Sequence, residues 1–158
     1  MRVWRLSLGR YGATDGEGAR LYGGRWNSPG IPAVYAATHI SLALLEQLVH
    51  VSLERIPTEF RAFAIDLPEG APVETAAGDV RPGDADAARR YGDTWAVSLR
   101  SAALIVASVL VPALLEPGGI ERCERNVILN PRHPSAAAWR VVETSFRIDR
   151  RLQRIAGT

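Results

Sequence analysis

Strand-like segments outnumber helical ones in this sequence, and the two kinds follow one another in an irregular order. Short runs that are apolar, or that alternate apolar and polar residues, are typical of β-strands, whereas apolar residues three and four apart are typical of helices. The pattern lacks the regular strand–helix–strand units that build parallel, doubly wound sheets. The sequence therefore predicts an α+β fold, with strands at 2–8, 33–37, 59–68, 103–112, 126–134 and 139–146 and helices at 39–54 and 84–101.

Length and composition suit one domain. The chain has 158 residues, 47% apolar and 23% charged, enough for a hydrophobic core within a single domain over 1–158. No apolar run approaches the roughly 20 residues that span a bilayer, and Arg5 interrupts the apolar start, unlike a signal peptide. The single cysteine, Cys123, excludes an intramolecular disulfide framework and a cysteine-only zinc site. We therefore expect a cytoplasmic protein with no membrane partner.

The charge pattern argues against a dedicated nucleic-acid surface. All 19 basic residues are arginines, and the formal net charge is only +2. Apart from the cluster at 147–154, the arginines are spread along the chain. Such a distribution favours solvated faces with one anion site over a basic binding patch. We therefore expect no direct nucleic-acid binding by this chain.

Residues 23–30, GGRWNSPG, place Arg25 and Trp26 in a bendable segment that follows a glycine-rich loop expected over 9–24. Glycines either make a turn or allow close approach to the backbone. Arginine can hold a phosphate through two parallel hydrogen bonds. The segment is therefore either a turn with a stray arginine or a loop that holds an anionic ligand.

The first expected helix places a carboxylate beside its apolar stripe, and the second has a capping residue and an internal glycine. In 39–54, Glu46 lies about 40° from Leu42 around the helix axis, at the margin of the apolar stripe and not on the middle of the polar face. Asp84 is expected to cap the second helix, in which Gly92 is a weak point. The stripe of the first helix consists of Leu42, Leu45, Val49 and Leu53.

Standard catalytic motifs are missing. The sequence contains no nucleotide P-loop, Rossmann fingerprint, HExxH or GxSxG, and its three histidines lack metal-ligand spacing, so we expect no metal. Four polar residues remain in unusual places: Arg25, Tyr35, Glu46 and Ser108. Each alone has a structural explanation, such as a turn arginine, a core ring, a paired carboxylate or a small strand residue. Together they supply the groups needed to cleave a phosphorylated glycoside.

The order of these residues resembles the RES-domain family, toxins of bacterial toxin–antitoxin pairs named for an Arg, a Glu and a Ser. The stretch GARLYGGRWNSPGIPAVYAATHISLALLEQLVH matches the family core in residue type and spacing. The later IVASVLVP and NVILNPRHP segments look like its serine strand and its Asn-Pro-x-His-Pro turn, so that the match covers 2–153. There are two departures: Ala107 precedes Ser108 where the family has proline, and the insert at 113–125 looks longer than usual.

The resemblance implies a fold similar to the NAD-dependent ADP-ribosyltransferases, with a mixed, split β-core and flanking helices around an NAD cleft. It also implies chemistry that consumes NAD+ and inhibition by a cognate Xre-type helix-turn-helix antitoxin. The acceptor of ADP-ribose stays open between water, phosphate and a protein side chain. One alternative is a protein-specific mono-ADP-ribosyltransferase with little free NAD depletion. An alternative of another class is a nucleic-acid-binding toxin.

Within this resemblance, three residues are expected at the reacting end of NAD+. Glu46 would stabilise positive charge on the ribose in an oxocarbenium-like transition state. Tyr35 would stack on the cationic nicotinamide ring. Ser108 would hydrogen-bond the nicotinamide amide or a ribose hydroxyl, without acting as a nucleophile, because no base accompanies it.

Three residues are expected at the pyrophosphate, and a fourth, Trp26, is considered beside Tyr35 at the nicotinamide ring. Arg25 would clamp the two phosphates bidentately, and Gly24 would let the backbone approach them closely. Arg20 is considered as a second clamp. Trp26 would either help to bind NAD+ or belong to the core.

Overall fold

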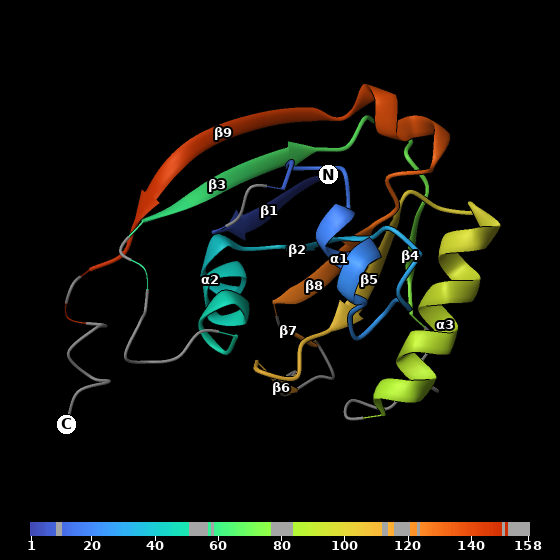
Figure 1. Ribbon diagram of the computed structural model, residues 1–158, viewed down its shortest axis with the longest axis horizontal. Coiled ribbons are helices and arrows are strands. Elements are labelled where there is room, and N and C mark those ends of the chain that lie inside the picture. The colour runs from blue at the N-terminus through green and yellow to red at the C-terminus, as the bar shows by residue number, and fades with distance from the viewer. Residues whose placement is uncertain are drawn as a thin grey trace.

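The computed structural model of the protein describes residues 1–8, 11–50, 57, 59–76, 84–111, 114–115, 121–122, 124–149 and 151. Its strands are β1 Arg2–Ser7, β2 Val34–Ala37, β3 Glu59–Asp66, β4 Val73–Thr75, β5 Ala103–Ala107, β6 Leu114–Leu115, β7 Glu121–Arg122, β8 Arg125–Leu129 and β9 Arg140–Arg147. Its helices are α1 Glu17–Tyr22, α2 Ile40–Leu48 and α3 Ala85–Ser98, with a 3-10 turn at Pro134–Ala138. The predicted α+β class is confirmed (Figure 1). None of the helices in these ranges has the length and apolarity needed to cross a membrane.

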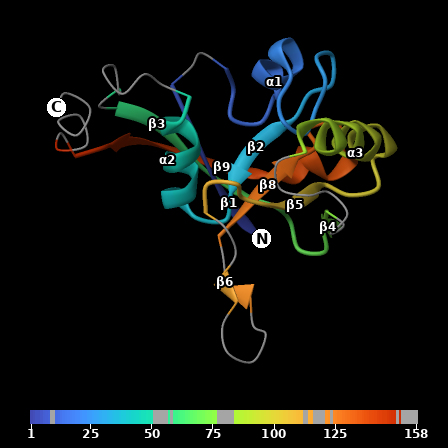
Figure 2. The same ribbon diagram turned by 90° about the horizontal axis from the view of Figure 1, so that it is seen from below.

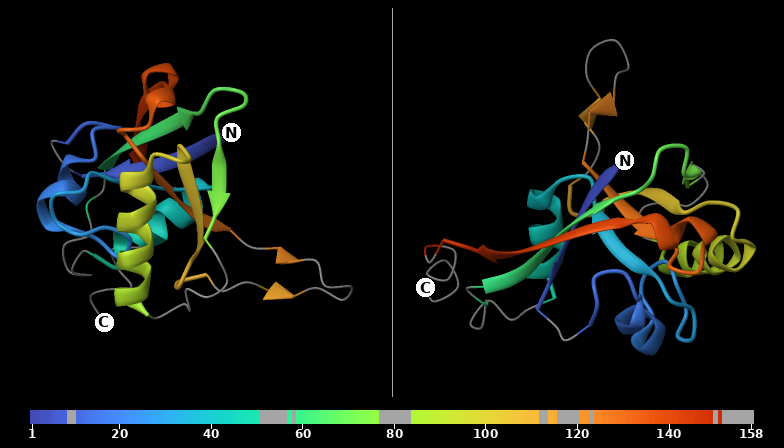
Figure 3. Two further views of the ribbon diagram at one scale, coloured as in Figure 1. Left: turned by 90° about the vertical axis from the view of Figure 1, so that its right-hand side faces the viewer. Right: turned by 90° about the horizontal axis from the view of Figure 1, so that it is seen from above.

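Seven strands form one sheet in the order β4-β5-β8-β2-β1-β3-β9. β4 and β5 pair in parallel, and the other neighbours in this sheet pair antiparallel. The sheet is therefore mixed. β6 and β7 form a separate two-stranded ladder that lies apart from it (Figure 3).

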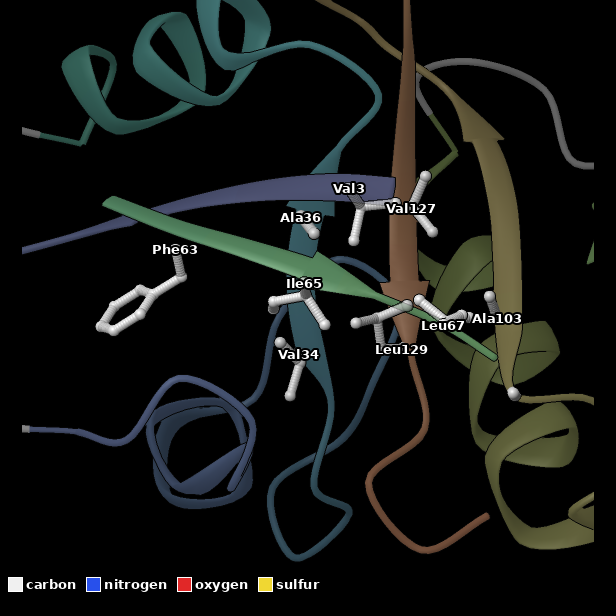
Figure 4. Packing of buried hydrophobic residues seen from close by; sticks show 10 residues of the cluster. Val3, Val34, Ala36, Phe63, Ile65, Leu67, Ala103, Val127 and Leu129 are labelled. Atoms are coloured by element: carbon white, nitrogen blue, oxygen red, sulfur yellow. The ribbon is translucent and has the colours of Figure 1, made fainter. Parts of the chain in front are cut away.

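The large sheet splits between β1 and β2. These strands pair at the single position Trp4–Ala37, whereas β1 pairs with β3 at six positions and β2 with β8 at four. Continuing the antiparallel register would place Leu6 opposite Tyr35, but the strands diverge there. Figure 4 shows β1 and β3 running across β2 and β8. This divergence is the split core that the resemblance implied.

The main core fills the space where the two halves of the sheet cross. Val3 and Ile65 come from one half and Val34, Val127 and Leu129 from the other, and all five are fully buried in one cluster (Figure 4). Alternate residues of a strand point to the same face, so each half contributes an apolar face to this cluster. Because the two halves of the sheet cross, the apolar faces of both are buried in this cluster, and β1 and β2 separate beyond the crossing point.

Two helices flank β2 and β8 on opposite sides (Figures 1 and 2). α2 buries Leu42 and Ala43 against Leu6, Ala37 and Phe60. The other helix, α3, buries Trp95 and Ala88 against Leu104 and Ile128. Asp84 caps α3 by accepting a hydrogen bond from the Ala87 N–H at 2.8 Å, as predicted.

α2 is rotated relative to its predicted apolar stripe. Leu42 is buried, but Leu45 and Val49 are 44% and 56% exposed, so their assignment to the buried stripe is wrong. Leu53 lies outside the described residues. Ala43 takes the inward position instead, and Glu46, one turn after Leu42, is half-buried. This rotation results from tertiary packing, because the small side chain of Ala43 lies against the crossing strands.

Two further predictions need correction. The glycine-rich segment 9–24 contains α1, which Gly16 and Gly23 bracket with positive φ angles of 67° and 72°. Glycine adopts a positive φ without the strain that a Cβ would cause, so it is suited to both ends of this short helix. The predicted strand 103–112 ends at Ala107, because the Ser108 hydroxyl accepts the N–H groups of Leu110 and Val111 and turns the chain.

Candidate active site

A cavity of about 680 Å³ opens where β1 and β2 diverge. Its wall includes residues 5–8 of β1 and the segment after it, together with Tyr35 of β2. α2 contributes Glu46 and Gln47, and His50 follows from the turn after the helix. The Gly-Gly-Arg-Trp loop closes another side with Gly23, Gly24, Arg25 and Trp26. The predicted residues Arg25, Tyr35 and Glu46 therefore share one cavity, although three different segments carry them.

The Glu46 carboxylate is held by one of its oxygens. Oε1 accepts a hydrogen bond from Asn126 Nδ2 at 2.6 Å and another from Ser108 Oγ at 3.2 Å. Among the described residues, no donor makes a hydrogen bond to the other carboxylate oxygen, Oε2. The carboxylate is thus oriented while its second oxygen stays available to a ligand.

Ser108 is buried, and its hydroxyl is fully engaged. Its oxygen accepts the N–H groups of Leu110 and Val111, each at 3.1 Å, and its proton is directed to Glu46. A hydroxyl has one proton and two lone pairs, so these three bonds use its whole capacity. Ser108 is also not among the residues that line the cavity. The geometry therefore connects Ser108 to Glu46.

Asn126 is a site residue that the sequence prediction omitted. It stands in β8, opposite Ala37 of β2, and both its side chain and Glu46 line the cavity. An asparagine within an apolar strand is the signal that could have pointed to it. Only the pairing of β8 with β2, however, brings it to Glu46.

The Tyr35 hydroxyl is fixed from two directions. It accepts the Trp26 N–H at 2.9 Å and donates to Asn27 Oδ1 at 2.7 Å. Burial is the main cause that raises the pKa of Tyr35 to about 12, so the hydroxyl is neutral at physiological pH. A Cβ on Gly24 would collide with the Tyr35 hydroxyl. The glycine therefore lets the loop close onto the ring.

Arg25 and Trp26 follow that glycine but differ in their surroundings. Arg25 is half-buried and lines the cavity, and no carboxylate of the described residues forms an ion pair with it. Trp26 is 7% exposed and packs edge-to-face on Tyr91, with ring centroids 6.3 Å apart. The side chain of Trp26 thus belongs mainly to the core, one of the two roles considered for it.

Arg20 is not brought to the cavity. Its guanidinium makes two hydrogen bonds to Glu17, at 2.7 and 2.9 Å, and it is absent from the cavity lining. The pair is three residues apart on α1, a spacing at which helix side chains meet. Arg20, which the sequence analysis considered as a second clamp on the pyrophosphate, is therefore held by Glu17.

Arg5 is the cationic residue that sequence reasoning missed. It lines the cavity from β1, and its buried Nε has no hydrogen-bond partner among the described residues. Burial lowers the pKa of the Arg5 guanidinium, and the Asp15 carboxylate offsets part of this effect. A buried donor left unpaired is costly, so a ligand that accepts a hydrogen bond here would relieve that cost. The signal was an arginine inside an apolar strand.

Comparison with known proteins gives consistent matches. The RES domain family matches residues 2–152 of the chain. Toxin Res of Photorhabdus laumondii is 38% identical, over 96% of this chain and 97% of its own. The Prs ADP-ribosylating toxin of a Sphingobium species is also 38% identical, over 84% of each chain.

Among solved structures, a chain of the M. tuberculosis MbcT–MbcA toxin–antitoxin complex is similar in fold, with a TM-score of 0.63. The similarity covers 99% of this chain and 89% of that one, at 20% sequence identity. The two chains therefore share a fold.

Proposed function

The chain belongs to the RES domain family, and on this premise we propose that it is the toxin of a toxin–antitoxin pair and cleaves the nicotinamide–ribose bond of NAD+. The observation that carries the proposal is the shared cavity: a cation, an aromatic ring and an oriented carboxylate from three segments converge in it. Two relatives at 38% identity are named as toxins, and one of them as ADP-ribosylating.

Glu46 supplies the main catalytic effect. When the glycosidic bond breaks, its electron pair leaves with the nicotinamide nitrogen, which needs no proton, and positive charge develops on the ribose. Asn126 and Ser108 hold Oε1 of the carboxylate, so Oε2 can face the ribose. A preoriented charge of this kind stabilises the transition state without reorganising during the reaction. We therefore assign Ser108 to positioning Glu46, in place of the predicted contact with nicotinamide.

Arg25 and Arg5 are proposed to bind the pyrophosphate. Both line the cavity, and neither has a carboxylate partner within hydrogen-bond distance among the described residues. Two guanidinium groups match the two phosphate charges, and each can donate two parallel hydrogen bonds. Arg5 takes the part that the sequence analysis gave to Arg20.

Tyr35 is proposed to stack on the nicotinamide ring. Its hydroxyl is held by Trp26 and Asn27, so the ring has a fixed orientation in the cavity wall. A neutral aromatic face attracts a cationic ring more strongly than a neutral one. The cation–π part of this attraction is lost as nicotinamide leaves uncharged, which helps release the product.

The acceptor completes the reaction by forming a bond from its nucleophilic atom to the ribose carbon and losing a proton. Water yields ADP-ribose, phosphate yields a phosphorylated ADP-ribose, and a protein side chain yields a modified protein. The Sphingobium relative, named for ADP-ribosylation of Prs, is the observation that favours a protein acceptor as the second candidate.

Incubation of the protein with labelled NAD+, with and without phosphate and cell lysate, tests the proposal. Chromatography identifies small products, and a gel detects labelled protein. Label that stays in intact NAD+ under all conditions would refute the proposed activity. A cognate Xre-type antitoxin, the partner we propose, should suppress turnover when added in stoichiometric amounts. Binding to RNA with a steep salt dependence, in the absence of NAD+ turnover, would favour a nucleic-acid-binding toxin instead.

A further inference from the structure

One face of α3 lies against the loop that carries Arg25. Asp93 accepts two hydrogen bonds from Ser28: the N–H donates to Oδ1 at 2.7 Å and the hydroxyl to Oδ2 at 2.6 Å. One turn earlier in the helix, Arg89 Nε lies 3.5 Å from the Gly24 carbonyl oxygen, a long contact. The helix therefore contacts the loop on both sides of Arg25.

Gly92 makes this close contact possible. A Cβ at residue 92 would overlap the Trp26 carbonyl oxygen. Glycine weakens a helix interior, and for this reason the sequence analysis described Gly92 as a weak point of the helix. Here the missing side chain lets α3 approach the loop backbone directly, and Asp93 then reaches Ser28.

The inner side of the loop is anchored separately. Tyr35 accepts the Trp26 N–H, and Asn27 Nδ2 donates to the carbonyl oxygens of Ala19 and Ile31. These bonds attach residues 26–27 to the core on the inner side of the loop. At the outer end, the N–H and the hydroxyl of Ser28 are both held by Asp93.

We propose that Asp93 is a positioning residue that sets where the Arg25 guanidinium lies in the cavity. This inference rests on the proposed function, in which Arg25 binds the pyrophosphate. Bidentate binding of phosphate requires a fixed orientation of the planar guanidinium, so a displaced guanidinium would bind the pyrophosphate less tightly. Releasing Ser28 frees the outer end of the loop, and Gly24 next to Arg25 lets the backbone pivot.

Steady-state kinetics of NAD+ cleavage test the proposal. Asp93→Ala should raise KM about tenfold and leave kcat within about twofold, because loss of binding that is equal in the ground and transition states raises KM alone. Asp93→Asn keeps an amide oxygen that can accept one bond from Ser28, so its KM should be intermediate. The matched control is Asp66→Ala, which also removes two hydrogen bonds, here from Arg2 outside the cavity, and should leave KM unchanged. A wild-type KM in folded Asp93→Ala would overturn the proposal.

A double-mutant cycle separates positioning from general stabilisation. If Asp93 acts through Arg25, adding Asp93→Ala to Arg25→Ala should not raise KM further. A second tenfold increase in that background would show that Asp93 acts independently of Arg25 and would overturn the proposal.

Amide hydrogen exchange tests whether Asp93 holds the loop, independently of whether the protein cleaves NAD+. In Asp93→Ala, residues 25–28 should exchange faster, while the amides of β8 and β3 keep their wild-type protection. If wild-type protein does not cleave NAD+, the proposed function fails, and the exchange data still decide whether Asp93 holds the loop. Unchanged exchange at 25–28 would refute that role.

Discussion

Replacing Glu46 by glutamine separates the charge of this residue from its shape. Asn126 Nδ2 and Ser108 Oγ both donate to Oε1, so a glutamine can keep both bonds through its amide oxygen. The amide nitrogen then occupies the position of Oε2 and presents hydrogen atoms to the ribose. The carboxylate charge is lost, and the local dipole is reversed.

The expected size of the effect follows from the half-buried position of Glu46. Two unit charges about 4 Å apart in a medium of effective dielectric constant about 20 interact by about 4 kcal/mol. Because each 1.36 kcal/mol corresponds to about a tenfold change in rate, kcat for nicotinamide release should fall about a thousandfold. The melting temperature should stay near the wild-type value, because both hydrogen bonds persist.

The assay is the initial rate of nicotinamide release at saturating NAD+, measured by chromatography. Glu17→Gln is the matched control: it neutralises an exposed carboxylate that pairs with Arg20 outside the cavity lining, and its kcat should be unchanged. In cells, Glu46→Gln should also abolish growth inhibition. A folded Glu46→Gln protein that releases nicotinamide at the wild-type rate would refute the proposed role of the carboxylate.

Other predictions concern the remaining groups of the cavity. Arg25→Ala and Arg5→Ala should each raise KM for NAD+ about 10- to 100-fold by removing a charge-assisted contact, whereas Arg20→Ala should leave KM unchanged; equal effects of all three in the same kinetic assay would contradict the assignment. Gly24→Ala should lower the melting temperature and the activity together, because its Cβ would displace the Tyr35 hydroxyl; calorimetry and nicotinamide release check this. Folding raises the pKa of Tyr35 from an ordinary value of 10.0 to about 12. Its neutral hydroxyl therefore contributes fully to the free energy of unfolding below pH 10, and this contribution is lost as the pH rises through 12. Chemical denaturation at high pH should show this loss in wild-type protein and a weaker one in Tyr35→Phe.

Several site residues could be predicted from the sequence because local chemistry marks them. Arg25 stands among glycines, Tyr35 in a short apolar strand and Glu46 on a helix, and the spacing of these elements resembles the RES-domain family. The cavity contains all three. Ser108 was also marked, but the orientation of its hydroxyl depends on a turn at Leu110 and Val111 that strand periodicity does not reveal.

The two arginines illustrate the limit of local reasoning. Arg20 was considered because it is close to Arg25 in sequence, yet Glu17, three residues away on α1, holds it. Arg5 is twenty residues from Arg25 and reaches the cavity because β1 diverges from β2 just after Trp4. The pairing of Arg20 is therefore local, whereas the place of Arg5 in the cavity depends on how distant strands cross.

The sequence by itself determined the α+β class, most strand positions and the inventory of reactive groups, because hydrophobic periodicity and side-chain chemistry are local properties. Only the tertiary structure decided the rotation of α2, which turned Glu46 inward when Ala43 packed against the sheet. It also decided that Asn126 holds the carboxylate and that α3 holds the loop of Arg25 through Asp93 and Ser28. Those contacts join residues up to 80 positions apart, and their geometry follows from packing of the whole core and not from any one segment.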